Sequence, residues 1–169
     1  MKRILIVGHG RAGKDVALDY LSQITGLRNA GTTSLYLAKY VAESLGVTPE
    51  VAYATRHADR DVWYRVGRQI RENNPGILLR EALAHGEMTG GLRDAEECIV
   101  ARDIVDLIVW IENNRVEADP TVMFGPEVAD VVIPNHGTMD EYRLRLRRPS
   151  TALANQPVRH SWFRRAIAT

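Results

Sequence analysis

Residues 4–15, Ile4-Leu5-Ile6-Val7-Gly8-His9-Gly10-Arg11-Ala12-Gly13-Lys14-Asp15, join an apolar run to a glycine-rich turn that carries a lysine. The four aliphatic residues at the start are typical of a strand that is buried on both faces, as in the parallel sheet of an α/β domain. Residues 16–24 repeat their apolar positions with helical spacing, and Gly26 is a typical helix end. The stretch therefore predicts a strand, a glycine turn and a helix.

Two glycine motifs overlap on this turn. The glycines at 8, 10 and 13 match the dinucleotide-binding pattern G-x-G-x-x-G, whereas Gly8, Gly13 and Lys14 match the phosphate-loop (P-loop) pattern G-x-x-x-x-G-K. The dinucleotide pattern is normally followed, about 20 positions later, by an acidic residue that binds a ribose hydroxyl. Residues 26–31 contain no carboxylate, but Arg28 could accept a 2′-phosphate, so the sequence is also compatible with an NADP-dependent oxidoreductase.

The lysine favours the P-loop interpretation. Glycines allow successive backbone N–H groups to face phosphate oxygens, and an ammonium directly after the last glycine reaches the β- and γ-phosphates of a nucleoside triphosphate. Asp15 stands where the general motif has Ser or Thr, and a carboxylate is a hard oxygen ligand that can hold Mg²⁺. The predicted nucleotide-binding residues, with Asp15 as the metal ligand, are Gly8, His9, Gly10, Arg11, Ala12, Gly13, Lys14 and Asp15.

Composition limits the classes of protein that fit. The chain has 169 residues, of which 45% are hydrophobic, and this predicts one domain with a sizeable core. Its net charge of +1 provides no overall field that would favour nucleic acid or an anionic membrane. Cys98 is the only cysteine, which excludes an intrachain disulfide and fits a reducing compartment. Because no apolar run approaches the length of a membrane span, the sequence predicts a cytoplasmic protein that does not enter the membrane.

The C-terminal end is basic, unlike the chain as a whole. After Glu141 there are seven arginines and no acidic residue. A basic tail at residues 149–169 could contact nucleic acid, but a solvated end or a contact with a second copy of the chain, as in a homodimer, is the favoured interpretation.

The middle of the chain predicts several helices. In residues 58–72, Trp63, Val66 and Ile70 repeat at three and four positions and are expected to face the core. The residues expected on the opposite face are Arg60, Tyr64, Arg68 and Arg71. With Arg56 and Arg65 in the same segment, this face predicts either a solvated surface or a site for an anionic ligand.

The later elements alternate between strands and helices. Residues 106–112 predict a second buried strand and residues 130–134 a last one, and helices are expected to start at Asp94 and Thr138. Alternation of this kind predicts a parallel sheet with helices on both faces, and the glycine loop should then lie at the carboxyl edge of the sheet.

The loop at residues 8–15, G-H-G-R-A-G-K-D, closely resembles the form of the P-loop found in the deoxynucleoside monophosphate kinases of bacteriophages. Leu92-Arg93-Asp94 and Asn135-x-Gly137 are also similar to segments of that family. The resemblance implies a P-loop NTPase fold of the nucleoside monophosphate kinase type, with about five parallel strands. It further implies ATP and Mg²⁺ as cofactors and transfer of the γ-phosphoryl of ATP to a deoxynucleoside monophosphate.

The resemblance also assigns roles to residues. Arg93 matches an arginine that contacts phosphate, whereas Gly91 stands where the family has an aspartate of the magnesium shell. Asp15 or Asp94 could replace that aspartate, or catalysis could be impaired. Arg115 is the one arginine of the expected mobile lid. The remaining residues that the resemblance implicates are Thr32, Thr33 and Tyr36 in the acceptor pocket and Asn135 and Gly137 near adenine.

The combined prediction is a kinase domain at residues 1–148, with an acceptor-binding helical region at about 32–85 and a lid at about 113–126. The predicted catalytic residues are Lys14, Arg93 and Arg115. The predicted acceptor-binding residues are Thr32, Thr33, Tyr36, Arg60, Tyr64, Arg65, Arg68 and Arg93. Two more functions are compatible with the sequence: a P-loop kinase that acts on a modified base in DNA, suggested by the basic tail, and a non-catalytic nucleotide-binding protein, suggested by Gly91.

Overall fold

A computed structural model describes residues 2–155 of the chain, so most of the basic tail predicted at 149–169 lies outside the described residues. Within them, five strands form one sheet, and every neighbouring pair is parallel. The strands are β1 (Ile4–Val7), β2 (Asn29–Thr32), β3 (Met88–Gly90), β4 (Leu107–Glu112) and β5 (Val131–Pro134). The helices are α1 (Lys14–Thr25), α2 (Thr33–Leu45), α3 (Pro49–Ala54), α4 (Arg60–Asn73), α5 (Ile77–His85), α6 (Ala95–Ile104), the 3-10 turn η1 (Pro126–Val128), α7 (Met139–Arg145) and α8 (Arg147–Asn155).

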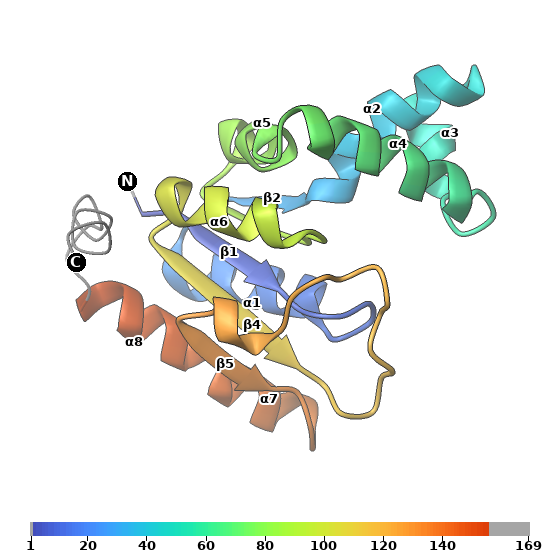
Figure 1. Cartoon of the computed structure of the whole chain (residues 1–169). Helices are drawn as coiled ribbons and strands as arrows, with labels where there is room; N and C mark the ends of the chain where they lie inside the picture. The colour runs from blue at the N-terminus through green and yellow to red at the C-terminus, as the bar shows by residue number, and fades with distance from the viewer. Residues whose placement is uncertain (1, 156–169) are drawn as a thin grey trace, which may run out of the picture.

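Helices cover both faces of the sheet, as Figure 1 shows for α1 and α6. The side chains of β1 explain this arrangement, because successive residues of a strand point to opposite faces. Ile4 and Ile6 pack with α1 and α7, whereas Leu5 and Val7 pack with α5 and α6. All four residues of β1 are fully buried. The prediction of an α/β protein with a parallel sheet and helices on both faces is confirmed.

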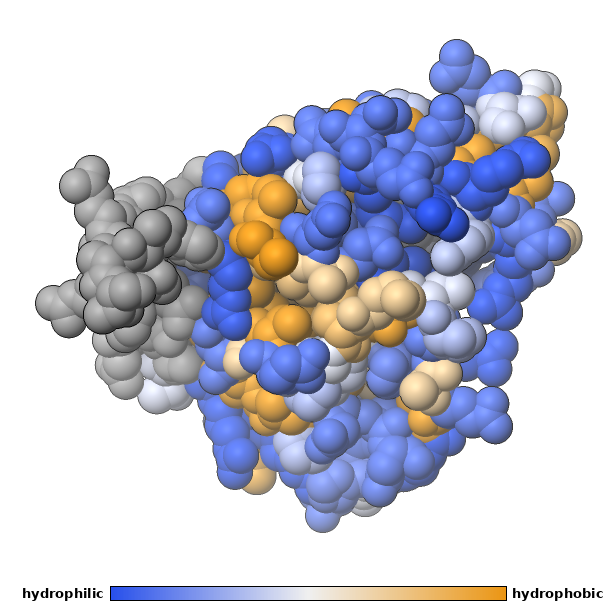
Figure 2. Space-filling model, viewed as in Figure 1, coloured by the Kyte–Doolittle hydropathy of each residue, from blue (hydrophilic) through white to orange (hydrophobic). Residues whose placement is uncertain are grey.

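Helices α2 to α5 form a separate layer beside β2 (Figure 1). A third apolar cluster holds these helices together; its members include Leu37 and Val41 of α2, Trp63 and Val66 of α4, and Leu78 of α5. The core face predicted for residues 58–72 is therefore confirmed for Trp63 and Val66. The outer surface over α4 is largely hydrophilic (Figure 2), as expected from its charged residues.

The strand order is β2-β3-β1-β4-β5, so the crossovers change their direction across the sheet next to β1. The crossover that leaves β1 runs toward β2, whereas the crossovers that leave β3 and β4 run the other way. In open parallel sheets, ligands bind at the carboxyl ends of the strands, next to such a reversal. The glycine loop follows β1 directly, so the topology places it at the expected position for a ligand site.

The predicted element ends are close to those observed. The strands expected at 106–112 and 130–134 span Leu107–Glu112 and Val131–Pro134, and the helix expected at 58–72 spans Arg60–Asn73. The helix expected at Asp94 has that residue as its N-cap. The segment expected to form a lid has no regular element before Pro126. None of the helices that the structure describes combines the length and apolar composition needed to cross a membrane.

Candidate functional site

The loop between β1 and α1 needs glycine at two positions for steric reasons. Gly8 has φ of +142° and Gly13 has φ of +102°, values that L side chains rarely adopt. A Cβ atom on Gly8 would also lie 2.5 Å from the backbone oxygen of Ile111. The loop therefore fits closely against the end of β4.

Three backbone donors of this loop have no acceptor within the described part of the chain, whereas the amide of Ala12 donates to the backbone oxygen of His9. The amides of Gly10, Arg11 and Gly13 make no hydrogen bond there, and no side chain caps the start of α1 at Gly13. The first turn of a helix leaves its N–H groups without intrahelical partners, and the helix dipole adds partial positive charge at the same place. Loop and helix together present a set of donors suited to an anion.

Lys14 lies over this loop. Its Nζ donates hydrogen bonds to the backbone oxygens of Gly8, at 2.8 Å, and His9, at 2.5 Å. Burial lowers the pKa of Lys14 from 10.5 to about 8, although Asp15 and Asp119 favour the charged form. The ammonium is thus held beside the free amides and is desolvated, which strengthens its attraction to phosphate.

Two side chains from the C-terminal part of the fold support the loop from outside. Asn135 Nδ2 donates to the backbone oxygen of Ala12 at 2.8 Å, and the hydroxyl of Tyr142 donates to that of Gly13 at 3.0 Å. Tyr142 is 1% exposed, and burial raises its pKa well above the usual value, so the phenol stays protonated. The sequence had predicted Asn135 near adenine, and its observed contact is with the loop backbone.

A cavity of about 350 Å³ opens beside the loop, at the carboxyl ends of β1, β2 and β3. Its lining joins segments that are distant in sequence: the glycine loop, the start of α2, α3 and α4 with their connection, the segment after β3, and residues 119–122. The predicted site residues that line it are Gly8, Gly10, Arg11, Lys14, Asp15, Thr32, Thr33, Arg60, Tyr64 and Arg93.

Several predicted residues lie outside this cavity. Tyr36 donates to the backbone oxygen of Ala30 and stacks on His85, and Arg68 pairs with Glu72 on the exposed side of α4. Arg115 donates to the backbone oxygen of Gly137 at 3.3 Å. The predicted residues that do not line the cavity are His9, Ala12, Gly13, Tyr36, Arg65, Arg68, Arg115, Asn135 and Gly137.

The lining is rich in cationic side chains. It includes six lysines and arginines but only two carboxylates, Asp15 and Asp119. The cationic residues are Arg11, Lys14, Arg56, Arg60, Arg71 and Arg93. Such an excess favours a ligand with several negative charges.

Asp119 is a lining residue that the sequence did not predict. Its Oδ2 accepts from Arg93 Nη1 at 3.0 Å, its Oδ1 accepts from Thr121, and its amide donates to His9 Nδ1 at 3.2 Å. Burial would raise the pKa of Asp119, but the hydrogen bonds from Thr121 and Arg93 outweigh it and lower the pKa from 3.8 to about 2. The ionised carboxylate also lies 3.2 Å from where a Cβ on Gly10 would be. The segment expected to be a lid therefore contacts the glycine loop and Arg93.

Arg71 corrects one prediction. Its spacing placed it on the face of α4 opposite the core, but the residue is only 7% exposed and lines the cavity. Its Nε donates to Asp94 Oδ2 at 2.5 Å, and Glu97 Oε2 lies 3.7 Å away. A buried charge needs ionic partners, and these two carboxylates of the α6 start provide them. Periodicity alone could not detect this, because it treats every arginine as a surface residue.

The far end of the cavity is aromatic. Tyr53, Trp63 and Tyr64 line it, and the guanidinium of Arg56 lies 4.2 Å from the centre of the Tyr53 ring. Trp63 and Tyr53 meet edge to face, with ring centres 6.3 Å apart. Aromatic rings and a stacked guanidinium suit a planar, partly apolar group such as a nucleobase.

The donor set of the cavity also suits a magnesium ion. Magnesium in phosphate-transfer sites is usually held by one or two carboxylates, waters and the substrate phosphates, and Asp15 and Asp119 are carboxylates that line the cavity. No group of three or more metal-ligating side chains occurs in the described residues. Gly91 has φ of +87° and accepts a hydrogen bond from the hydroxyl of Thr33 through its backbone oxygen, so this position provides no carboxylate.

No model of a known protein family and no curated protein matches the chain.

Proposed function

We propose that the chain is a P-loop phosphotransferase that moves the γ-phosphoryl group of ATP to a deoxynucleoside monophosphate. One observation carries the proposal: unpartnered loop amides and Lys14 line one end of a cavity whose opposite end is lined by arginines and aromatic rings. Such a cavity offers a triphosphate and a nucleotide acceptor positions beside each other. The order of the strands and the place of the loop after β1 support assignment to the P-loop class.

On the donor side, the chain would bind phosphate mainly through its backbone. The amides from His9 to Lys14 would hold the β-phosphate, and the ammonium of Lys14 would leave the carbonyls of Gly8 and His9 to bridge β- and γ-oxygens. Asn135 and Tyr142 would keep the loop in this shape, since they hold the oxygens of Ala12 and Gly13.

On the acceptor side, Arg93 and Arg60 would bind the monophosphate, and Tyr53, Trp63 and Tyr64 would contact the base. An oxygen of the acceptor phosphate attacks the γ-phosphorus while the bond from that phosphorus to the bridging oxygen breaks, which yields a diphosphate and ADP. An ionised phosphate is already nucleophilic, so the reaction needs positioning and charge neutralisation rather than a side-chain base.

Asp15 and Asp119 would hold Mg²⁺. When bound, the ion neutralises charge on the transferred phosphoryl group. Asp119 also orients Arg93 from the loop at 113–125, and the charge of Asp15 favours the charged form of Lys14. Closure of that loop over bound substrates would exclude water and prevent hydrolysis of ATP, and Arg115 is the residue of the loop predicted to add charge on closure.

The experiment is a transfer assay with ATP, Mg²⁺ and each of the four common deoxynucleoside monophosphates, with formation of ADP as the readout. Duplex DNA containing modified bases and NADPH binding serve as further arms. ADP formation that requires one monophosphate supports the proposal. Transfer only to DNA would establish the kinase of modified bases, tight ATP binding without transfer would establish a nucleotide-binding protein, and NADPH binding in place of ATP would establish an oxidoreductase.

A further inference from the structure

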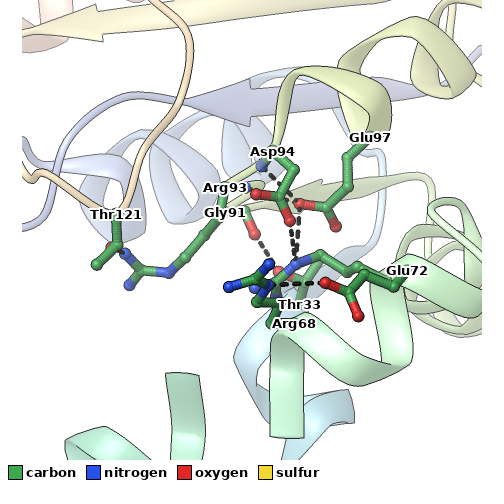
Figure 3. Close-up of polar contacts among 9 residues, drawn as sticks. Thr33, Arg68, Glu72, Gly91, Arg93, Asp94, Glu97 and Thr121 are labelled. Atoms are coloured by element: carbon green, nitrogen blue, oxygen red, sulfur yellow. Dashed lines mark hydrogen bonds and ion pairs between the residues drawn. The ribbon is translucent and has the colours of Figure 1, made fainter. Parts of the chain in front are cut away.

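Arg71 is a buried cation at the inner wall of the cavity, and it belongs to a network of carboxylates at the start of α6. Figure 3 shows Asp94 and Glu97 turned toward α4, while Arg93 extends the other way toward Thr121. Arg71 Nε donates to Asp94 at 2.5 Å and lies 3.7 Å from Glu97 Oε2. Glu97 is 1% exposed and Arg71 is 7% exposed, whereas the side chain of Asp94 is 38% exposed, so only the inner part of this network is buried.

Glu97 also positions the backbone of Arg93. Glu97 Oε2 accepts from the amide of Arg93 at 2.8 Å and from that of Asp94 at 3.1 Å. Burial raises the pKa of Glu97, but these amides and the charge of Arg71 favour its ionised form. Glu97 therefore holds the backbone of Arg93 and, together with Asp94, the guanidinium of Arg71, and both arginines line the cavity.

Arg71 uses only part of its donor capacity in this network. Both contacts with the carboxylates involve Nε, which leaves the two terminal nitrogens without an acceptor among residues 2–155. Among the described residues, two side-chain atoms are fully buried and lack a hydrogen-bond partner, and neither is a terminal nitrogen of Arg71. Arg71 is 7% exposed and lines the cavity, so a ligand would reach its terminal nitrogens from the cavity.

A purely structural ion pair would use the guanidinium differently. Arginine normally meets a carboxylate through two parallel N–H bonds, and that geometry is the strongest one available to it. Here the terminal nitrogens, which form the fork suited to two oxygens of one phosphate, make no hydrogen bond to the described residues, and Arg71 lines the cavity. Leaving four donors without partners in a buried side chain is costly unless a ligand satisfies them.

We propose that Arg71 binds the phosphate group of the acceptor nucleotide through its terminal nitrogens, with Asp94 and Glu97 fixing the guanidinium in place. The inference rests on the proposed function for the identity of the acceptor. It assigns the acceptor phosphate to the space between Arg71 of α4 and Arg93 after β3, and it replaces Arg65 and Arg68, which lie outside the cavity.

Binding of inorganic phosphate and of the four common deoxynucleoside monophosphates, measured by calorimetry, tests this. The variant Arg71→Met should weaken monophosphate binding about tenfold to hundredfold, the range for loss of hydrogen bonds to a charged group. Binding of a non-hydrolysable ATP analogue should change less than threefold, since that ligand is assigned to the glycine loop. The matched control is Arg80→Met, an exposed arginine of α5 that does not line the cavity.

Arg71→Met removes the ionic partner of Asp94 and of the buried Glu97 and could unfold the chain, so Arg71→Lys provides a second variant. It keeps a positive charge near Asp94 but loses the fork, and it should weaken monophosphate binding about tenfold. Equal losses for Arg71→Lys and Arg80→Met, or equal losses for the monophosphate and the ATP analogue, would overturn the inference. So would a wild-type chain that binds neither phosphate nor any monophosphate. If wild type binds a monophosphate but transfers nothing to it, the proposed function fails, and the binding ratio still decides the role of Arg71.

Discussion

The two ends of the cavity are built in different ways. The glycine loop draws its donors from consecutive residues, 8–14, and mainly from the backbone, so its chemistry depends on where glycine occurs. The opposite end draws single side chains from α3 and α4, and the segment after β3 and the loop at 113–125 add Arg93 and Asp119 next to the glycine loop. Its chemistry depends on which side chains the fold turns inward.

Substitutions should therefore affect the two ends of the cavity differently. A backbone site tolerates changes of most side chains but not of its glycines or its lysine, whereas a site made of side chains loses its contacts one at a time. Changes at the loop should therefore affect the reaction most, and changes at the opposite end should affect single ligands.

The largest effect is expected for Lys14→Ala. Loss of a preorganised cation at the transferred group typically lowers turnover by about 10² to 10³. Steady-state ADP formation with ATP and the preferred monophosphate measures this. Lys39→Ala is the matched control, because Lys39 pairs with Glu81 on the surface and lies outside the cavity. Turnover of Lys14→Ala close to that of wild type would remove the loop from the mechanism.

The next effect separates two arginines that have the same predicted role. Arg93→Met should lower kcat/KM for the acceptor about tenfold to hundredfold, since Arg93 lines the cavity. Arg115→Met should have a smaller effect, since Arg115 contacts the backbone of Gly137 and lies outside the cavity. Equal losses for the two variants would mean that the loop at 113–125 closes further and carries Arg115 inward.

A pH dependence should distinguish the loop from the opposite end. The pKa of Lys14 is about 8, so the free protein loses the ammonium as the pH rises above that value, while a bound triphosphate requires it. Affinity for a non-hydrolysable ATP analogue should fall by up to about tenfold per pH unit above pH 8. Calorimetric titrations between pH 7 and about pH 9.5 measure it, with Lys14→Met as the control. The same slope in Lys14→Met would assign the titration to another group.

The smallest effect is expected at Asp119. Its pKa is lowered to about 2, so its contribution to stability is present above the ordinary pKa of 3.8 and is lost as the pH falls toward 2. Arg93 is 42% exposed, and a pair of this kind contributes about 1 kcal/mol or less. Urea unfolding of wild type and Asp119→Asn should differ near pH 6 and converge as the pH falls below about 3. A constant difference at every pH would show that the ionised carboxylate is not what stabilises the fold.

The loop end could be predicted from the sequence because its constraints are local. Gly8 and Gly13 adopt backbone conformations that most residue types avoid, and Lys14 follows at a fixed spacing, so the motif survives in the linear order of residues. The capped start of α6 at Asp94 is local in the same sense. Side chains that line the cavity one at a time lack such a local sequence pattern. Asp119 lies before Pro120 in a polar loop, and Arg71 has the same helical spacing as the charged residues on the outer face of α4.

From the sequence alone came the α/β architecture, the parallel sheet and the position of the glycine loop, because buried aliphatic runs and glycine conformations are imposed within a few residues. Only the tertiary structure decided that Arg71 faces inward, that Asp119 reaches Arg93, and that Arg68 and Arg115 lie outside the cavity. The physical reason is that the ionic partners of a charged side chain decide where it points, and these partners are distant in the sequence. Those of Arg71 begin 23 positions away at Asp94, and that of Arg93 lies 26 positions away.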